Sequence, residues 1–149
     1  MQLNMKEIEY VNFEGQVLGV ILRANYKNSG IKFFTPNDFS QQIGYMNHPK
    51  GHIILPHVHN SLPREVHYTK EVLFIKSGKI RVDFYEENKN YIESRIINSG
   101  DFLLLASGGH GFEMLEPTEM IEIKQGPYAG ETDKTRFKSI DKDKIKIKN

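Results

Sequence analysis

The stretch Pro56-His57-Val58-His59 is the part of this chain that most restricts its fold. Five of the six histidines of the chain lie within residues 48–67, around this stretch. In a β-strand, residues two apart point to the same face and lie about 6–7 Å from each other at the Cα atoms. A strand through this stretch therefore directs the imidazoles of His57 and His59 into one cavity, which is half of a metal site.

Two further candidate ligands lie outside this stretch. Glu71 stands directly before the apolar run Val72-Leu73-Phe74-Ile75, and His110 is the one histidine that is distant in sequence. Imidazole and carboxylate groups together suit Zn, Fe, Mn, Ni or Cu. The working hypothesis from these residues is a metal centre of His57, His59, Glu71 and His110.

Composition limits the class of protein. The 149 residues are the size of one domain, so a single domain is expected over residues 1–149. The 20 basic and 19 acidic residues leave a formal charge of +1, which favours neither nucleic acid nor an anionic membrane as a partner. There is no cysteine, which excludes disulfides and thiolate ligands. No signal peptide or membrane-spanning apolar run is visible, so we expect a cytoplasmic protein.

Most of the chain alternates short β-type segments with turn residues. Val, Ile, Phe and Tyr fill the segments, and Gly, Asn, Ser and Pro separate them. Many short strands with frequent turns are typical of a β-sandwich or a barrel, so the sequence predicts an all-β fold. The expected extended segments are 8–13, 16–26, 31–34, 44–46, 53–59, 71–76, 80–85, 91–97, 102–105, 110–115 and 119–125.

The end of the chain has a different composition. From residue 126 onward Gly, Pro and charged residues dominate, and the last residues mix Lys with isolated Ile. This pattern fits either a final edge strand protected by lysines or a frayed tail. Tyr128 and residues 134–136 fit phosphate binding or closure over a partner subunit, although charged residues in such a segment are usually just solvated.

The spacing around the histidines resembles the first motif of the cupin family. That motif is a Gly, five residues, His-x-His, a spacer, Glu, six residues and a second Gly. Here Gly51 is followed by five residues and then His57 and His59, and Glu71 is followed by six residues and then Gly78. Both ends of the motif are present.

The spacer of this motif is long, with 11 residues between His59 and Glu71 where the family usually has three or four. Glu65 is the alternative carboxylate ligand, but it lacks the strand and the glycine that follow Glu71. A long loop adds little closure entropy and is a common place for substrate contacts. The residues expected to contact substrate at the rim are Arg64, His67 and Lys70.

The second cupin motif is a Gly, five residues, Pro-x-Gly, two residues, His, three residues and Asn. Gly100 is followed by five residues and then Ala106-Ser107-Gly108, which has Ala in place of Pro. His110 comes one residue early, and Met114 stands where the family has Asn. His110 is nevertheless the only histidine available at this position.

The resemblance implies a single-domain antiparallel β-barrel of the cupin type, also called a double-stranded β-helix or jelly roll. Its core covers about residues 42–125, and residues 126–149 form a C-terminal extension. Cupins are often dimers, so a homodimer is expected. The family holds one divalent transition metal (Fe, Mn, Ni or Zn) in the barrel mouth, and its ligands here are His57, His59, Glu71 and His110. Four ligands leave one or two positions for water and substrate.

Two main classes of function fit these residues. The first is a metal-dependent enzyme that isomerises, epimerises or oxygenates a small polar metabolite, and by family analogy that metabolite is a sugar or nucleotide-sugar of carbohydrate biosynthesis. The second is a binding module that senses a small ligand or a metal without turnover. A third, a scaffold for assembly, makes the histidines incidental. The sequence assigns no catalytic acid or base.

Overall fold

The computed structural model describes residues 6–148 of the chain. These residues contain ten β-strands and two short 3-10 helices, and no α-helix. The first strands are β1 (Ile8–Phe13), β2 (Gln16–Leu22), β3 (Gly30–Phe33), β4 (Gly44–Asn47) and β5 (Glu71–Ser77). The remaining elements are β6 (Lys79–Tyr85), β7 (Tyr91–Asn98), β8 (Phe102–Leu105), β9 (Gly109–Met114), β10 (Glu119–Lys124), η1 (Gly130–Asp133) and η2 (Lys142–Lys144).

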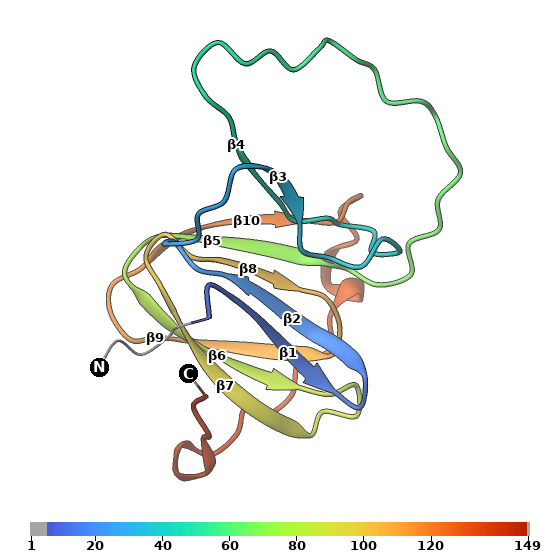
Figure 1. Ribbon diagram of the computed structural model, residues 1–149. Helices are drawn as coiled ribbons and strands as arrows, with labels where there is room; N and C mark the ends of the chain where they lie inside the picture. The colour runs from blue at the N-terminus through green and yellow to red at the C-terminus, as the bar shows by residue number, and fades with distance from the viewer. Residues whose placement is uncertain (1–5, 149) are drawn as a thin grey trace.

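Eight of the strands form two sheets that face each other (Figure 1). One sheet has the order β1-β2-β8-β5-β10, and the other has the order β7-β6-β9. β3 and β4 form a separate pair. Every pairing between these strands is antiparallel. The predicted all-β fold is confirmed, and within residues 6–148 the sheets are not closed into a barrel.

Alternation along the facing strands builds the core between the two sheets. Leu73 and Ile75 of β5 point inward from one sheet, and Ile80, Val82 and Phe84 of β6 point inward from the other. Each of these side chains is at most 3% exposed. Burying an aliphatic or aromatic side chain of this size stabilises the fold by about 1.5–3 kcal/mol. The same alternation brings the first residue of β5 to the inner face at one end of the sandwich.

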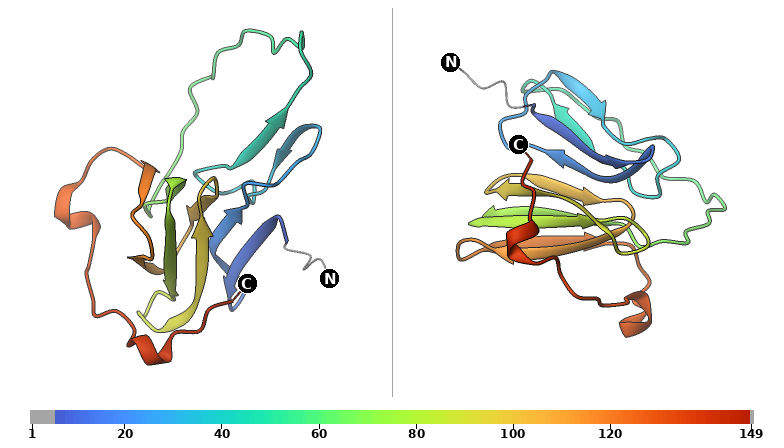
Figure 2. Two further views of the ribbon diagram at one scale, coloured as in Figure 1. Left: turned by 90° about the vertical axis from the view of Figure 1, so that its left-hand side faces the viewer. Right: turned by 90° about the horizontal axis from the view of Figure 1, so that it is seen from below.

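A second apolar cluster lies on the outer face of the five-stranded sheet. Val20 and Leu104 of that sheet pack there with Phe34, which directly follows β3. This cluster fixes the β3–β4 pair beside the sheet (Figure 2). It does not cover β10, where Ile121 and Ile123 are 52% and 59% exposed.

Residues 48–70 form one long connection that arches away from both sheets (Figure 1). The prediction of a strand over residues 53–59 is wrong, because that segment forms no ladder with any described strand. A strand exists only beside a neighbour that accepts its backbone hydrogen bonds, and nothing in residues 6–148 lies alongside this segment.

Buried ion pairs tie the two sheets together at one end. The guanidinium of Arg23, just after β2, donates to Glu9 of β1 and to Asp101, which lies 2.8 Å away. It also donates to the carbonyl oxygen of Ile96 in β7 at 2.8 Å. Asp101 in turn accepts the backbone N–H of Asn98 at 2.8 Å. Strands of both sheets therefore meet at this cluster.

The C-terminal extension packs against the body of the protein. The ring of Phe137 lies edge-on to Tyr85, with 4.9 Å between centroids, and the N–H of Ile140 donates to the Tyr85 hydroxyl at 2.9 Å. Ile147 forms a parallel bridge with Ser94 at the free edge of β7. The sequence left open whether the C-terminal residues form an edge strand or a frayed tail, and up to Lys148 they pair with a strand edge. Asn149 lies outside the described residues.

Among the residues that the structure describes, no helix is both long and apolar enough to cross a membrane.

Candidate functional site

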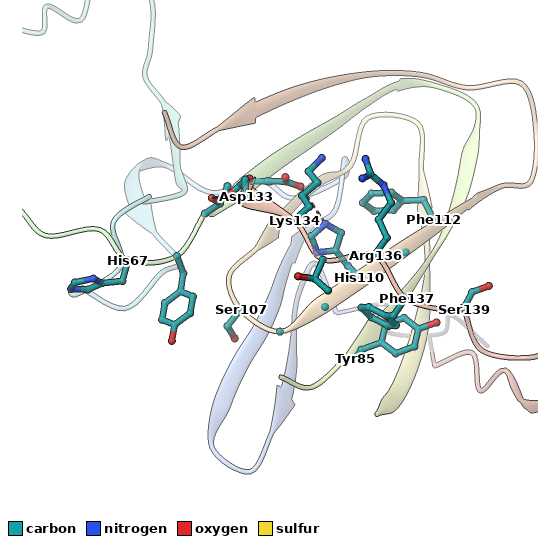
Figure 3. A pocket seen from close by; sticks show the side chains of 17 residues that line it. His67, Tyr85, Ser107, His110, Phe112, Asp133, Lys134, Arg136, Phe137 and Ser139 are labelled. Atoms are coloured by element: carbon teal, nitrogen blue, oxygen red, sulfur yellow. Dashed lines mark hydrogen bonds and ion pairs between the residues drawn. The ribbon is translucent and has the colours of Figure 1, made fainter. Parts of the chain in front are cut away.

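A pocket of about 600 Å³ lies at the end of the sandwich where Glu71 begins β5 (Figure 3). Glu71 pairs with Leu105 at the end of β8, so the buried Asp101, just before β8, lies at the other end of the sheet. Three parts of the chain form the walls of the pocket: the segment 67–71 leading into β5, the turn and strand 107–112, and the C-terminal residues 133–139. Tyr85 at the end of β6 completes the lining. Its volume suits one small molecule.

Glu71 and His110 meet in this pocket. Oε2 of Glu71 lies 3.3 Å from Nε2 of His110, and the two side chains are 7% and 29% exposed. Glu71 faces inward because it begins the buried series that continues with Leu73. His110 faces inward because it pairs with Phe84, a core residue, and residues directly opposite in a ladder share a face.

The surroundings of Glu71 favour its charged form. The hydrogen bond from His110 lowers the pKa of Glu71 below its ordinary value, and burial acts in the opposite direction. The positive charges of Lys134 and Lys124 lower the pKa further. At neutral pH the group is therefore a carboxylate, which is the form that binds a metal or accepts a proton.

The C-terminal extension supplies the outer wall of the pocket. Thr69, just before β5, donates its hydroxyl to Asp133 at 2.5 Å, which joins the two walls. Lys134 and Arg136 carry positive charge at this wall (Figure 3), and Arg136 forms an ion pair with Glu131. The charge of Lys134 also lowers the pKa of Glu71. An anionic ligand group would meet positive charge here.

Tyr85 joins the extension to the pocket lining. Burial raises the pKa of its phenol, so the group stays protonated at neutral pH. The hydroxyl oxygen accepts the N–H of Ile140, and its proton remains available as a donor.

The structure leaves His57 and His59 far from this pair, in the exposed connection 48–70. Their rings lie 5.3 Å apart, and Nδ1 of His57 lies 3.0 Å from the carbonyl oxygen of Leu55. Within residues 6–148, no three His, Asp or Glu side chains converge closely enough to hold a metal ion. Two of the four predicted ligands, Glu71 and His110, are thus brought together, and two are not.

The geometry favours Glu71 over Glu65 as the carboxylate of the site. The side chain of Glu65 is 88% exposed, and its Oε2 lies 3.3 Å from Nε2 of His67. Glu71, in contrast, is buried beside His110 inside the pocket.

The three residues that were predicted to contact substrate at the rim do not all lie at the pocket. His67 lines the pocket, whereas Arg64 is exposed in the long connection. The ammonium group of Lys70 lies 5.1 Å from the ring centre of Phe39, on the β3–β4 side. Sequence reasoning missed Tyr85, since its role depends on an extension that packs back from more than 50 residues away. In the sequence, the two basic residues Lys134 and Arg136 were the feature that could have indicated the outer wall of the pocket.

Comparison of the chain with protein-family models, with curated proteins and with solved structures found no match in any of the three.

Proposed function

We propose that this chain is a cupin-type protein that uses a divalent metal to act on a small polar metabolite carrying an anionic group. The observation that carries the proposal is the meeting of Glu71 and His110, which come from strands of different sheets, at 3.3 Å in a pocket of small-molecule size. The expected reactions are isomerisation, epimerisation or oxygenation, and a sugar or nucleotide-sugar is the substrate class that the cupin resemblance suggests.

The backbone at the motif glycines supports a jelly-roll arrangement. Gly78, Gly100 and Gly108 have φ angles of +91°, +87° and +70°. A side chain on Gly78 or Gly108 would come within 2.3 Å of a backbone oxygen. These positions need glycine to turn the chain tightly between the two sheets, as the cupin motifs require.

The chemistry of the donor set fits a divalent transition metal. A buried carboxylate beside an imidazole offers two ligands of the type that Fe, Mn, Ni and Zn take in proteins. His57 and His59 would supply the other two if the segment 53–59 came to lie against β9. A bound metal would polarise a substrate oxygen as a Lewis acid.

Substrate positioning falls to the residues of the pocket wall. Lys134 offers positive charge for an anionic group such as a phosphate or a carboxylate. The Tyr85 hydroxyl is a hydrogen-bond donor for a sugar or carbonyl oxygen. The ring of Phe137, packed edge-on against Tyr85, forms part of the pocket wall beside these groups.

A second candidate function is ligand binding without turnover. It is favoured by the separation of His57 and His59 from the pocket, because no third metal ligand joins Glu71 and His110 among residues 6–148, and such a pocket can bind an anionic or polar ligand without a metal.

Elemental analysis of the full chain, purified without added metal or a histidine tag, tests the proposal. One equivalent of a transition metal that is lost in Glu71→Ala and kept in Glu65→Ala is the expected result. The Glu65→Ala variant is the matched control because it removes an exposed carboxylate from the same region. A wild-type protein that holds no metal and takes up no Fe, Mn, Ni or Zn contradicts metal dependence and favours the binding module.

A further inference from the structure

The long connection 48–70 is unusual because it is both apolar and exposed. Seven of its large apolar side chains are 41–86% exposed, namely Ile53, Ile54, Leu55, Val58, Leu62, Val66 and Tyr68. A loop of this length without structure of its own is uncommon in a compact domain. Exposed apolar side chains that cluster in one segment are typical of an interaction site. We therefore expect the apolar side chains of this connection to pack against another protein surface.

The body of the protein offers such a surface, because two sheet edges are open on one side. β10 ends the five-stranded sheet and β9 ends the three-stranded sheet, and residues 115–118 join these two strands directly. Phe112 and Met114 of β9 pair with core residues of β6 and so face the interior, yet they are 37% and 46% exposed. The sandwich is open along β9, whereas the edge of β7 is covered by residues 146–148.

The segment 53–59 has the alternation that this opening requires. Its odd-numbered residues share one face when the segment is extended, and they are apolar at the first two positions and histidine at the last two. The inner face of β9 has the matching order in reverse, with a histidine first and then two apolar residues. The residues concerned are Ile53, Leu55, His57 and His59 on the segment, and His110, Phe112 and Met114 on β9.

Only an antiparallel pairing of residues 53–59 with β9 places histidine opposite histidine and apolar residues opposite apolar residues. With His57 opposite His110, the histidines arrive at the end of β9 where Glu71 lies. A parallel strand would carry them to the far end, beside exposed apolar side chains. In the antiparallel register the remaining opposite pairs are Leu55 with Phe112 and Ile53 with Met114.

The segment of the same chain is held away from this edge. It follows β4, and Asn47 of β4 donates to the carbonyl oxygen of Asn28 at 2.8 Å, beside the pairing with β3. The β3–β4 pair is packed on the outer face of the five-stranded sheet, whereas β9 belongs to the other sheet (Figure 1). A second copy carries the same segment and the same open edge, which is the self-complementarity that a two-fold dimer needs.

We infer that two copies of this chain exchange residues 53–59, each copy laying the segment as a strand along the β9 edge of the other. The exchange brings His57 and His59 of one copy to Glu71 and His110 of the other, so that each site is built from both chains. The role of the histidines rests on the proposed metal function, whereas the exchange of the strand needs no metal.

Engineered disulfides test the exchange without reference to metal. The chain has no cysteine, so a single introduced cysteine gives no background. Full-length Leu55→Cys and Phe112→Cys chains are co-expressed with different tags, oxidised and separated under non-reducing conditions. Covalent dimers with one chain of each kind are expected, because opposite residues of antiparallel strands lie within disulfide reach. Ile54→Cys replaces Leu55→Cys in the control, since its side chain points to the other face.

Three outcomes of this experiment contradict the exchange. One is a disulfide within a single monomeric chain in the Leu55→Cys/Phe112→Cys double variant, which means that the segment folds back on its own β9. Another is the absence of a covalent link in both the mixture and the double variant. The third is an equal yield of dimers from Ile54→Cys and Leu55→Cys.

Complementation tests the shared site. A His57→Ala/His59→Ala chain and a Glu71→Ala/His110→Ala chain are co-expressed, and Ni²⁺ binding is measured by equilibrium dialysis. The mixed dimer is expected to hold one Ni²⁺, because one of its sites has all four ligands, whereas each variant alone holds none. A His48→Ala/His52→Ala chain, which changes nearby histidines, is expected to bind as wild type. A mixed dimer that binds no Ni²⁺, when wild type does, overturns the shared site. If the Leu55→Cys and Phe112→Cys chains form the expected covalent dimer but the wild-type protein binds no metal, the metal proposal is overturned and the exchange of the strand stands.

Discussion

Asp101 Oδ2 lies 2.8 Å from Nη1 of Arg23, and both groups are largely buried at the start of β8. The carboxylate also accepts the backbone N–H groups of Ala24 at 2.9 Å and of Asn98 at 2.8 Å. The Arg23 guanidinium in turn reaches Ile96 in the other sheet. One ion pair therefore anchors the ends of strands from both sheets.

Asp101→Ala is expected to destabilise the protein by about 3–5 kcal/mol, because it leaves the Arg23 guanidinium buried without that partner. Urea denaturation followed by circular dichroism measures the change in the free energy of unfolding. Asp143→Ala removes an exposed carboxylate and is the control. A loss below about 1 kcal/mol would show that Glu9, which already pairs with Arg23, and solvent are sufficient partners for the guanidinium.

Gly108→Ala is expected to disrupt the turn that carries β9 into the pocket. Gly108 has a φ of +70°, and a Cβ there would lie 2.3 Å from the Tyr85 carbonyl oxygen. The left-handed backbone alone costs an alanine about 1–2 kcal/mol, and the clash adds to this cost. The thermal unfolding temperature should fall clearly. Gly111→Ala is the matched control, since a Cβ at Gly111 meets nothing within 4 Å, and equal effects of the two variants would contradict the prediction.

Glu86→Gln is expected to destabilise the protein at neutral pH and not in acid. Glu86 accepts the backbone N–H groups of Asn88 and Asn90, both at 2.9 Å, and these bonds lower its pKa below the ordinary value of 4.5. A carboxylate with a lowered pKa in the folded state stabilises the protein above the unfolded pKa, and this contribution is lost as the pH falls through the folded pKa. Denaturation curves of both proteins from pH 7 to about pH 3 should therefore converge in acid. A gap that stays constant over this range would rule out the charge as its cause.

Phe137→Ala is expected to loosen the outer wall of the pocket. The edge-to-face contact with Tyr85 contributes about 0.5–1.5 kcal/mol beyond burial, so its loss should speed trypsin cleavage near Lys134 and Arg136 roughly two- to tenfold. Mass spectrometry of a limited digest measures the rate. Tyr128→Ala, which changes an 86% exposed ring in the same extension, should leave the rate unchanged. Unchanged cleavage in Phe137→Ala would mean that other contacts hold the wall.

Local pattern was enough to predict most of the strands. β6 and β7 follow from alternation within one segment, and the apolar run 102–105 is a strand with three of its four residues buried. The proximity of Glu71 to His110 was implied by the resemblance to the cupin motifs, which place both residues at fixed distances from turn glycines.

Contacts between distant segments were not predictable in the same way. The position of Phe137 against Tyr85 depends on where the extension travels after β10, and no local pattern records that path. The segment 53–59 has the alternation of a strand but lacks a neighbour in residues 6–148.

One face of β5 carries both core and site, since Glu71, Leu73 and Ile75 alternate with Val72 and Phe74. A slip of one residue against β8 would turn Val72 and Phe74 inward and expel Leu73, Ile75 and the carboxylate together. A register error in β5 therefore disturbs the native core packing and the Glu71 site at the same time. The register that packs Leu73 and Ile75 into the core is therefore the same register that places Glu71 beside His110, so correct folding of β5 also builds the pocket.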